Sequence, residues 1–283
     1  MCRLAAFIGD LRAASGELRA FEQLAVHNGD GFGIGGFVDG RALVRKSPVT
    51  ALDNPEFTLA DFGDANSAIV HLRKATVGGV DTRNTHPFDM GDRIVAHNGS
   101  IGDRDALDRA LGLDLERLGV AGETDSERFA ALLHQKTLEA GGDTVLGYQL
   151  AAHHLAEHNP MTSLTSVTTT ADGDLFALRY PENRSIFWKR MGARDAEAGQ
   201  RLLVPGERGG VTVLASRPLD AEAGWVELMP GELLHVRAGD LHETVIKVID
   251  EEPIRRFTDA FVDEGASWTG PRRHQLVEAA LGG

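Results

Sequence analysis

The sequence lacks several common features, and each absence narrows the possible classes of protein. One cysteine among 283 residues excludes a disulfide within the chain. No apolar run approaches the roughly 20 residues that a membrane-spanning helix needs. The first residues also lack the basic segment, apolar core and small-residue cleavage site of a secretory signal. We therefore expect a cytoplasmic protein, because a reducing compartment suits a lone functional thiol.

Positive charge is also scarce. The chain has 29 Lys and Arg against 42 Asp and Glu, which gives a formal net charge of −13. A nucleic-acid backbone or an anionic membrane attracts clustered Lys and Arg. The balance therefore argues against nucleic acid or membrane as the principal partner and favours a small-molecule substrate or another protein.

Two patterns resemble ligand sites without completing one. The glycine-rich turn over residues 27–36 lacks the Gly-Lys-Ser/Thr end of a P-loop and leads into a strand, whereas a dinucleotide fingerprint leads into a helix. Its glycines suit either a tight turn or a backbone that comes close to a ligand. His153, His154 and His158 occur without a His-Glu-x-x-His pattern. We expect no metal and no cofactor.

The order of the predicted elements indicates the fold class. Alternation, apolar runs and turn signals predict strands over residues 3–9, 42–46, 67–74, 93–96, 163–170, 175–180, 185–190, 201–204, 211–216, 233–236 and 241–249, and a further strand that the glycine-rich turn over residues 27–36 feeds and that ends at residue 38. Helical patterns cover residues 15–26, with Ser15 as the cap, then 103–111, 126–140, 143–158 and 275–281. Strands, then helices, then strands predict a layered α+β protein. We expect one domain over residues 1–250 and a C-terminal extension over residues 251–283.

Cys2 is the first candidate for chemistry. Removal of Met1 would leave Cys2 as the first residue, with a free α-amine beside its thiol. The α-amine has a pKa of about 7.7 to 8.0 and the thiol one of about 8.5. The amine can therefore take the thiol proton, directly or through one water, which makes a nucleophile and its base from one residue. The alternative is that Cys2 is an incidental small residue after the start codon.

Three further positions could complete a site for a thiolate that attacks an amide. The Asn98 side chain and the Gly99 backbone N–H could bind the oxyanion, although Asn-Gly is also a common type I′ turn. Arg73, at the end of a strand, is either a surface charge or a clamp for a carboxylate. Asp125, at a helix start, is either a first-turn charge or a ligand for an ammonium group. Arg73 and Asp125 together would recognise the α-amino-acid end of a substrate.

A family resemblance joins these positions. The sequence resembles the class II glutamine amidotransferases, which are N-terminal nucleophile hydrolases, in six segments in register: residues 1–2, 30–33, 71–76, 85–88, 96–99 and 122–127. Residues 215–219 and 225–231 are similar to stand-alone members such as the ergothioneine-pathway γ-glutamyl amidohydrolase.

The resemblance implies a four-layer αββα sandwich and an amidohydrolase. Cys2 would attack the γ-carbonyl of glutamine or a γ-glutamyl metabolite, with its own α-amine as the base, and the resulting thioester would be hydrolysed to glutamate. The other implied roles are Asn98 and Gly99 as the oxyanion hole, Arg73 at the substrate carboxylate with help from Thr76, Asp125 at its amine, and His86 in ordering a loop.

One difference from the family's sequence pattern means that the leaving group of the substrate is not predicted. Many members carry an Arg-Gly pair where this sequence has His27-Asn28-Gly29, which places it nearer the stand-alone branch. Two alternatives to a hydrolase therefore remain open. The chain could supply ammonia as the glutaminase subunit of a separate synthetase, or it could be a non-catalytic module that binds glutamate or glutamine.

Overall fold

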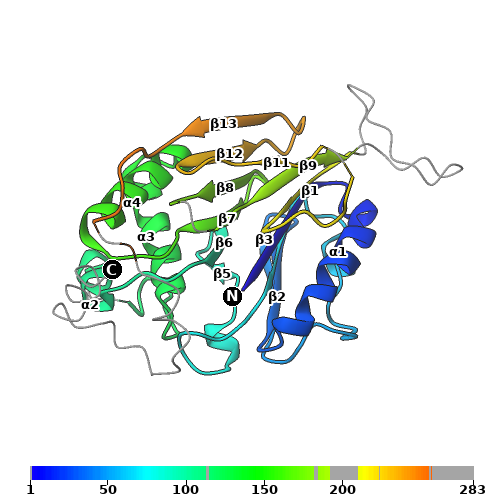
Figure 1. Ribbon diagram of the computed structural model, residues 1–283, viewed down its shortest axis with the longest axis horizontal. Helices are drawn as coiled ribbons and strands as arrows, with labels where there is room; N and C mark the ends of the chain where they lie inside the picture. Colours follow the sequence, from blue (N-terminus) through cyan, green and yellow to red (C-terminus); the bar gives the residue numbers. More distant parts are fainter. Residues whose placement is uncertain are drawn as a thin grey trace, which may run out of the picture.

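Two β-sheets packed face to face form the centre of the molecule, and helices cover their outer faces (Figure 1). The structure, a computed structural model, describes residues 2–112, 115–181, 184–191, 210–222, 224–254 and 256. The order of layers is helix, sheet, sheet, helix. This confirms the predicted αββα sandwich.

The first sheet has the N-terminal strand at its centre. Its strands are β1 (Arg3–Gly9), β2 (Phe32–Val38), β3 (Arg41–Ser47), β4 (Ser67–Leu72), β9 (Phe187–Met191), β10 (Val211–Ala215) and β11 (Val226–Glu227). They are antiparallel in the order β11-β9-β10-β1-β4-β2-β3. Because β1 pairs on both sides, Cys2 leaves the sheet between the ends of two strands.

The second sheet supplies the opposite wall. Its strands are β5 (Phe88–Asp89), β6 (Arg93–Asn98), β7 (Thr165–Thr170), β8 (Leu175–Arg179), β12 (Glu232–Val236) and β13 (Glu243–Lys247). They are antiparallel in the order β13-β12-β8-β7-β6-β5. The prediction that the strand ends at residue 96 was wrong, because His97 and Asn98 continue the pairing with β7.

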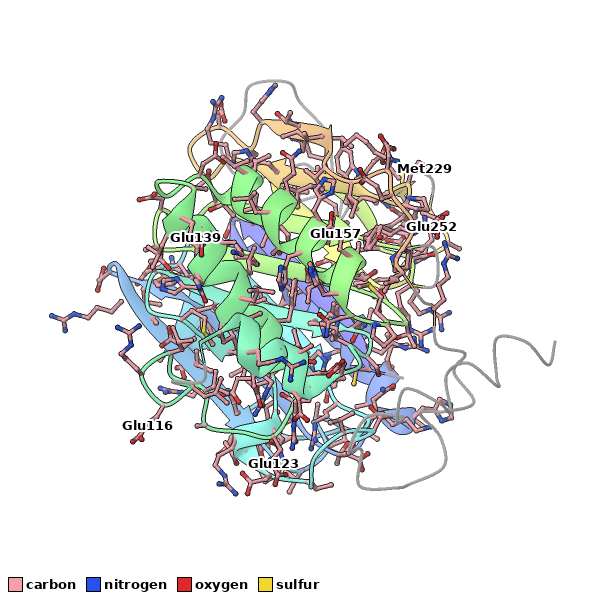
Figure 2. All side chains as sticks on the ribbon, turned by 90° about the vertical axis from the view of Figure 1, so that its left-hand side faces the viewer. Glu116, Glu123, Glu139, Glu157, Met229 and Glu252 are labelled. Carbon is pink, nitrogen blue, oxygen red and sulfur yellow. The ribbon has the colours of Figure 1, made fainter. Side chains whose placement is uncertain are left out.

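Helices lie on the two outer faces. They are α1 (Ser15–Glu22), α2 (Arg104–Ala110), α3 (Asp125–Glu139) and α4 (Thr144–His158), with 3₁₀ turns at Leu11–Ala14, Gln23–His27, Ala60–Phe62 and Thr82–Asn84. α1 lies on the outer side of the first sheet, and α3 and α4 lie together on the outer side of the second (Figure 1). Figure 2 shows α3 and α4 from outside, with the exposed carboxylates of Glu139 and Glu157 turned to solvent.

The predicted cap of α1 was wrong. Asp10 accepts a hydrogen bond from the backbone N–H of Arg12 at 3.1 Å and so caps the preceding 3₁₀ turn. The chain enters α1 directly from that turn. Ser15 is the first residue of the helix, and the N-cap residue is Ala14, whose side chain makes no capping hydrogen bond. The helix also changes to 3₁₀ geometry after Glu22, where the sequence predicted a helix to residue 26.

Alternation along β1 divides its side chains between two layers of the core. Leu4, Ala6 and Ile8 pack between the two sheets. Ala5 and Phe7 pack on the other face, in the cluster that includes residues of α1. This is the period of two that a strand imposes. Cys2, two residues before Leu4, therefore belongs to the face between the sheets.

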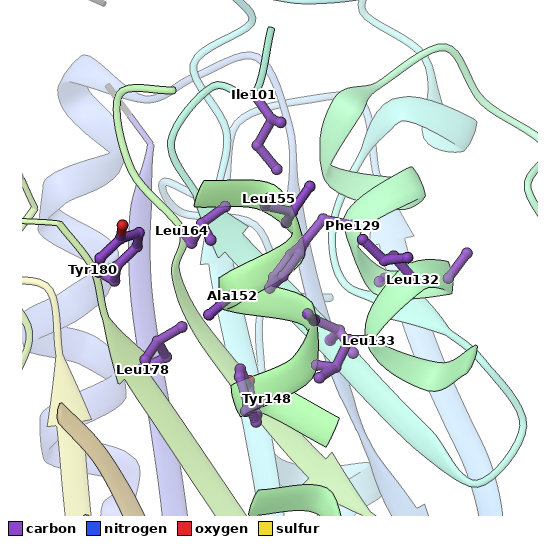
Figure 3. Close-up of a cluster of buried hydrophobic side chains, with 14 of the residues drawn as sticks. Ile101, Phe129, Leu132, Leu133, Tyr148, Ala152, Leu155, Leu164, Leu178 and Tyr180 are labelled. Carbon is purple, nitrogen blue, oxygen red and sulfur yellow. The ribbon is translucent and has the colours of Figure 1, made fainter. Parts of the chain in front are cut away.

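A third cluster joins α3 and α4 to the second sheet (Figure 3). Phe129, Tyr148 and Leu155 are fully buried there. The Tyr148 hydroxyl also lies 2.7 Å from the Thr168 hydroxyl, so a polar contact ties α4 to β7 inside this core.

Some expectations fall outside the described residues, namely the strand over residues 201–204 and the helix over residues 275–281. The division between residues 1–250 and 251–283 stays a prediction. Within the described residues, the sequence did not predict the two-residue strands β5 and β11. No helix in this part of the chain combines the length and apolar character needed to cross a membrane.

Truncation of Leu155 tests the packing of α4 on the second sheet. Leu155 is completely buried, whereas Leu150 on the same helix is 38% exposed. We expect Leu155→Ala to lower the free energy of unfolding by about 2 to 5 kcal/mol, because the cavity adds to the lost burial. Leu150→Ala should cost clearly less. Urea unfolding followed by circular dichroism measures both, and equal losses would contradict this packing.

Candidate active site

Cys2 is held between the ends of both sheets. Its sulfur lies 3.3 Å from the backbone nitrogen of Lys74, just beyond β4, and 3.4 Å from the carbonyl oxygen of the same residue. Its own carbonyl accepts a hydrogen bond of 3.3 Å from the Asn98 side-chain amide at the end of β6. Burial raises the pKa of the Cys2 thiol, while the Lys74 backbone contact lowers it. The thiol thus needs a nearby base or cation to ionise readily.

The turn after β6 brings Asn98 and Gly99 to this sulfur. Gly99 has φ +155°, and a Cβ there would overlap the carbonyl oxygen of Ser163. The Ser100 N–H then donates to the Thr162 hydroxyl at 2.8 Å, which fixes the chain beyond the glycine. Only glycine therefore fits this close approach of two backbone segments.

Arg73 is 3% exposed and organises the segment that follows it. Its guanidinium donates to the carbonyl oxygens of Gly79 at 3.0 Å, Val77 at 3.1 Å and Gly78 at 3.4 Å. A guanidinium has five N–H donors, so three hydrogen bonds leave two donors for a ligand. On the other side, Asp30 accepts the Ala75 N–H at 2.9 Å and holds the start of the same segment.

Asp125 lies at the first turn of α3, below the turn that carries Gly99. Its carboxylate accepts the Ile101 N–H at 2.7 Å. Burial raises the pKa of Asp125 to about 6, although backbone N–H groups at the helix start act in the opposite direction. Among the described residues Asp125 has no ion-pair partner. It is a buried carboxylate that a cationic ligand would complement.

The start of α3 is fixed independently of any ligand. The Thr124 hydroxyl accepts the Glu127 N–H at 3.2 Å, as an N-cap does. The Glu127 carboxylate reaches back to the N–H groups of Ala121 at 3.1 Å and Gly122 at 2.6 Å. These bonds leave Asp125 in a preset position.

His97 joins the two halves of the site, which the sequence did not predict. Its Nε2 lies 2.8 Å from the Ser163 carbonyl oxygen and its Nδ1 lies 2.9 Å from the Ser126 hydroxyl. A carbonyl only accepts, so Nε2 carries the proton and Nδ1 accepts from the serine. Burial lowers the pKa of His97 to about 4. A neutral imidazole therefore ties β6 to α3.

Two further imidazoles lie in the same region and are also neutral. His71 and His86 stack with their ring centroids 4.1 Å apart. Burial lowers the pKa of His71 to about 3 and that of His86 well below its usual value. A proton on either ring would be costly at neutral pH, so neither serves as a charged acid there.

One pocket collects the predicted residues. Cys2, Arg73, Thr76, Asn98, Gly99 and Asp125 all line it. Sequence reasoning missed the lining residues Lys74 and Arg184. Arg184 comes from the segment before β9, where no local pattern marks a site. Within the described part of the chain no group of three His, Cys, Asp or Glu could hold a metal ion.

The close approach at Gly99 makes a testable prediction. Gly99 and Gly91 both have φ above zero, but only a Cβ at position 99 meets other atoms. A residue with a Cβ at positive φ costs about 1 to 2 kcal/mol in either case. We expect Gly99→Ala to lose about 1 to 3 kcal/mol more than Gly91→Ala, because its methyl group overlaps backbone. Chemical denaturation of the two variants measures this difference, and equal stabilities would rule out the overlap.

The chain is similar in sequence to known proteins. A γ-glutamyl-hercynylcysteine sulfoxide hydrolase of Mycobacterium tuberculosis is 28% identical over 214 residues, covering 74% of this chain and 76% of that protein. An uncharacterized protein of Methanocaldococcus jannaschii is 29% identical over 277 residues, covering 84% of this chain and 72% of its own.

The fold has solved relatives. The glutamine phosphoribosylpyrophosphate amidotransferase of B. subtilis superposes with a TM-score of 0.58 at 16% identity, covering 89% of this chain. The chain spans half the length of that enzyme. Residues 1–258 match the family described as class-II glutamine amidotransferases. The chain therefore belongs to the class II glutamine amidotransferases, the family of amidohydrolases that its motifs predict.

Proposed function

We propose that the mature protein, after loss of Met1, uses the Cys2 thiolate to cleave the γ-amide bond of glutamine or of a γ-glutamyl metabolite. The observation that carries this proposal is the convergence of Cys2, Asn98, Arg73 and Asp125 on one pocket. A relative named as a γ-glutamyl-hercynylcysteine sulfoxide hydrolase supports a γ-glutamyl substrate.

The α-amine of Cys2 would be the base. It takes the thiol proton, and its positive charge then favours the thiolate against the burial that raises the thiol pKa. The Lys74 N–H, 3.3 Å from the sulfur, supplies a hydrogen bond to the thiolate. The neighbouring histidines are weak bases, since burial lowers the pKa of His97 to about 4 and that of His71 to about 3.

The oxyanion would bind at the turn after β6. One amide hydrogen of Asn98 is used on the Cys2 carbonyl at 3.3 Å, which leaves the other for the substrate oxygen. The Gly99 N–H supplies the second donor. One such donor lowers the barrier by about 3 to 4 kcal/mol.

Arg73 and Asp125 would recognise the two charges of the substrate's α-amino-acid end. Arg73 keeps N–H donors beyond those used on residues 77–79, and these can bind a carboxylate by charge-assisted hydrogen bonding. Thr76, which lines the same pocket, assists there. The Asp125 carboxylate accepts from the α-ammonium group, which gives it the counter-ion that it lacks.

Two steps complete the reaction. The sulfur forms a bond to the carbonyl carbon of the γ-amide, the C–N bond breaks, and the α-ammonium of Cys2 returns its proton to the leaving nitrogen. Water then attacks the γ-glutamyl thioester with the α-amine again as base, and the C–S bond breaks. Glutamate leaves and the thiol is restored.

Loss of the sulfur tests the nucleophile. Intact-mass measurement of the active protein should show that Met1 is absent. Cys2→Ala should abolish glutamate release from glutamine, glutathione and γ-glutamyl amines, while a change of the exposed Arg41→Gln should leave it intact. Retained Met1 in a fully active enzyme, or undiminished turnover in Cys2→Ala, would contradict the mechanism. Glutamate binding without turnover in the wild-type protein would instead support a non-catalytic module.

The raised pKa of Asp125 predicts a pH dependence. Only the ionised carboxylate attracts an ammonium group, so kcat/KM should fall as pH drops through about 6. At about pH 5 protonation of Asp125 should by itself lower kcat/KM roughly tenfold, in addition to the loss that comes from protonation of the α-amine base. Asp125→Asn should lower kcat/KM and remove the part of the acid limb near pH 6, whereas Asp64→Asn, at an exposed ion pair, should preserve that part. A wild-type profile that stays flat down to about pH 5 would rule out this role.

A further inference from the structure

The end of β6 directs two consecutive side chains into different layers of the molecule. Ala96 packs between the two sheets, whereas Val95 packs in the cluster that joins α3 and α4 to the second sheet. The same alternation places His97 on the side of α3 and Asn98 on the side of Cys2. The turn that carries the proposed oxyanion hole is therefore attached to the nucleophile by one residue and to α3 by the residue before it.

The attachment to α3 is a buried hydrogen bond. His97 is 2% exposed and Ser126 is 5% exposed, and the serine hydroxyl lies 2.9 Å from Nδ1 of the ring. Nε2 donates to the Ser163 carbonyl at 2.8 Å, and this is the carbonyl that a Cβ at Gly99 would overlap. One imidazole thus contacts the start of α3 on one side and the backbone packed against Gly99 on the other.

This hydrogen bond joins the two ends of the proposed glutamyl site. Ser126 follows Asp125, the proposed partner of the α-ammonium group, and His97 precedes Asn98 in the oxyanion turn. Asp125 has its own bond to this turn, because it accepts the Ile101 N–H at 2.7 Å, but that bond uses the carboxylate that the ammonium group also needs. His97 and Ser126 line the pocket as well, yet the proposed reaction gives them no substrate group to bind.

We propose that the hydrogen bond between Ser126 and His97 fixes the separation between the oxyanion turn and Asp125, and so makes the enzyme select a glutamyl chain over an aspartyl chain. This inference rests on the proposed function. An aspartyl substrate has one methylene group fewer, so its ammonium group falls short of Asp125 while its carbonyl oxygen lies between Asn98 and Gly99. His97 and Ser126 are positioning residues, because they act through these three.

Such selection requires that the two ends of the site keep their spacing. A displacement of about 1 Å can cost a hundredfold in rate, and a site holds its geometry to that precision only when hydrogen bonds behind it are formed. Burial lowers the pKa of His97 to about 4. The ring therefore stays neutral near pH 7, and Nδ1 remains an acceptor for the Ser126 hydroxyl.

Two affinity labels measure the chain-length preference at the nucleophile. The reagent 6-diazo-5-oxo-L-norleucine has the chain length of glutamine, and 5-diazo-4-oxo-L-norvaline has that of asparagine. Each alkylates a thiol with loss of dinitrogen, and Cys2 is the only cysteine of the chain, so intact mass gives the labelling rate of Cys2. We expect the wild-type protein to react about 10- to 200-fold faster with the longer reagent. Equal rates would overturn the selection.

Ser126→Ala tests the hydrogen bond directly. We expect the ratio of the two labelling rates to fall at least about fivefold, because the donor to His97 is lost. Ser67→Ala is the matched control. Its hydroxyl is also buried and donates to the Gly173 carbonyl at 2.8 Å, but it lies at the start of β4, away from the pocket at the other end of this strand. This control should keep the wild-type ratio, and an unchanged ratio in Ser126→Ala would overturn the proposal.

A double-mutant cycle separates positioning from direct contact with the substrate. If Ser126 acts by placing Asp125, then adding Ser126→Ala to Asp125→Asn should change the ratio by less than about twofold. The full fivefold loss in that background would overturn the positioning role. Glutamate release by the wild-type protein, with an unchanged ratio in Ser126→Ala, would leave the hydrolase standing and remove this inference. Absence of both glutamate release and Cys2 labelling would contradict the proposed function and this inference with it.

Discussion

The rest of the structure depends on the attachment of Cys2 to both sheets. Its sulfur contacts the backbone of Lys74 beyond β4, and its carbonyl is bound by Asn98 at the end of β6. β1 is paired on both edges, so a shift of Cys2 would break two ladders. A slip of one residue would also exchange the two faces of β1. Burial of Leu4 between the sheets therefore determines which way the sulfur points.

Burial explains why the proposed base is the α-amine. The polar groups beneath the pocket include His71, His86 and His97, and desolvation lowers the pKa of all three rings. An imidazole in that state forms fixed hydrogen bonds, as His97 does, but has little basicity at neutral pH. A free α-amine has a pKa of about 7.7 to 8.0 in model peptides, which suits a base near neutral pH. The same desolvation raises the pKa of Asp125, because the charged form of a carboxyl group is the deprotonated one.

The sequence predicts those parts of the molecule that local patterns determine. The bounds of β1 were predicted to the residue, and α3 and α4 to within one residue at each end, because their apolar patterns are uninterrupted and their caps are local. Cys2, Arg73, Asn98 and Asp125 were singled out from motifs, and the structure brings them to one pocket. Their catalytic and binding roles stay predictions.

Other features depend on contacts between distant segments. β6 extends through Asn98 because it pairs with β7, some seventy residues later in the chain. No local sequence pattern predicts this pairing. Ser15 lost its predicted role because Asp10 caps a preceding turn. Arg184 reaches the pocket that contains Cys2 because the segment before β9 is attached to the second sheet through Thr165. A site residue contributed by sheet order, rather than by a motif, leaves no trace in a single sequence.

The sheet order also resolves an apparent conflict in the electrostatics. A chain with net charge −13 should repel anionic substrates at long range. At physiological ionic strength, however, exposed charges are screened beyond about 8 Å, so the acidic side chains of α3 and α4 on the outer face have little effect in the pocket (Figure 2). The nearest charged groups decide the local potential, and those that line the pocket of Cys2 are Arg73, Lys74 and Arg184 beside Asp125. An acidic protein can therefore present a cationic pocket, provided that its fold collects the few basic residues at one end of a central strand.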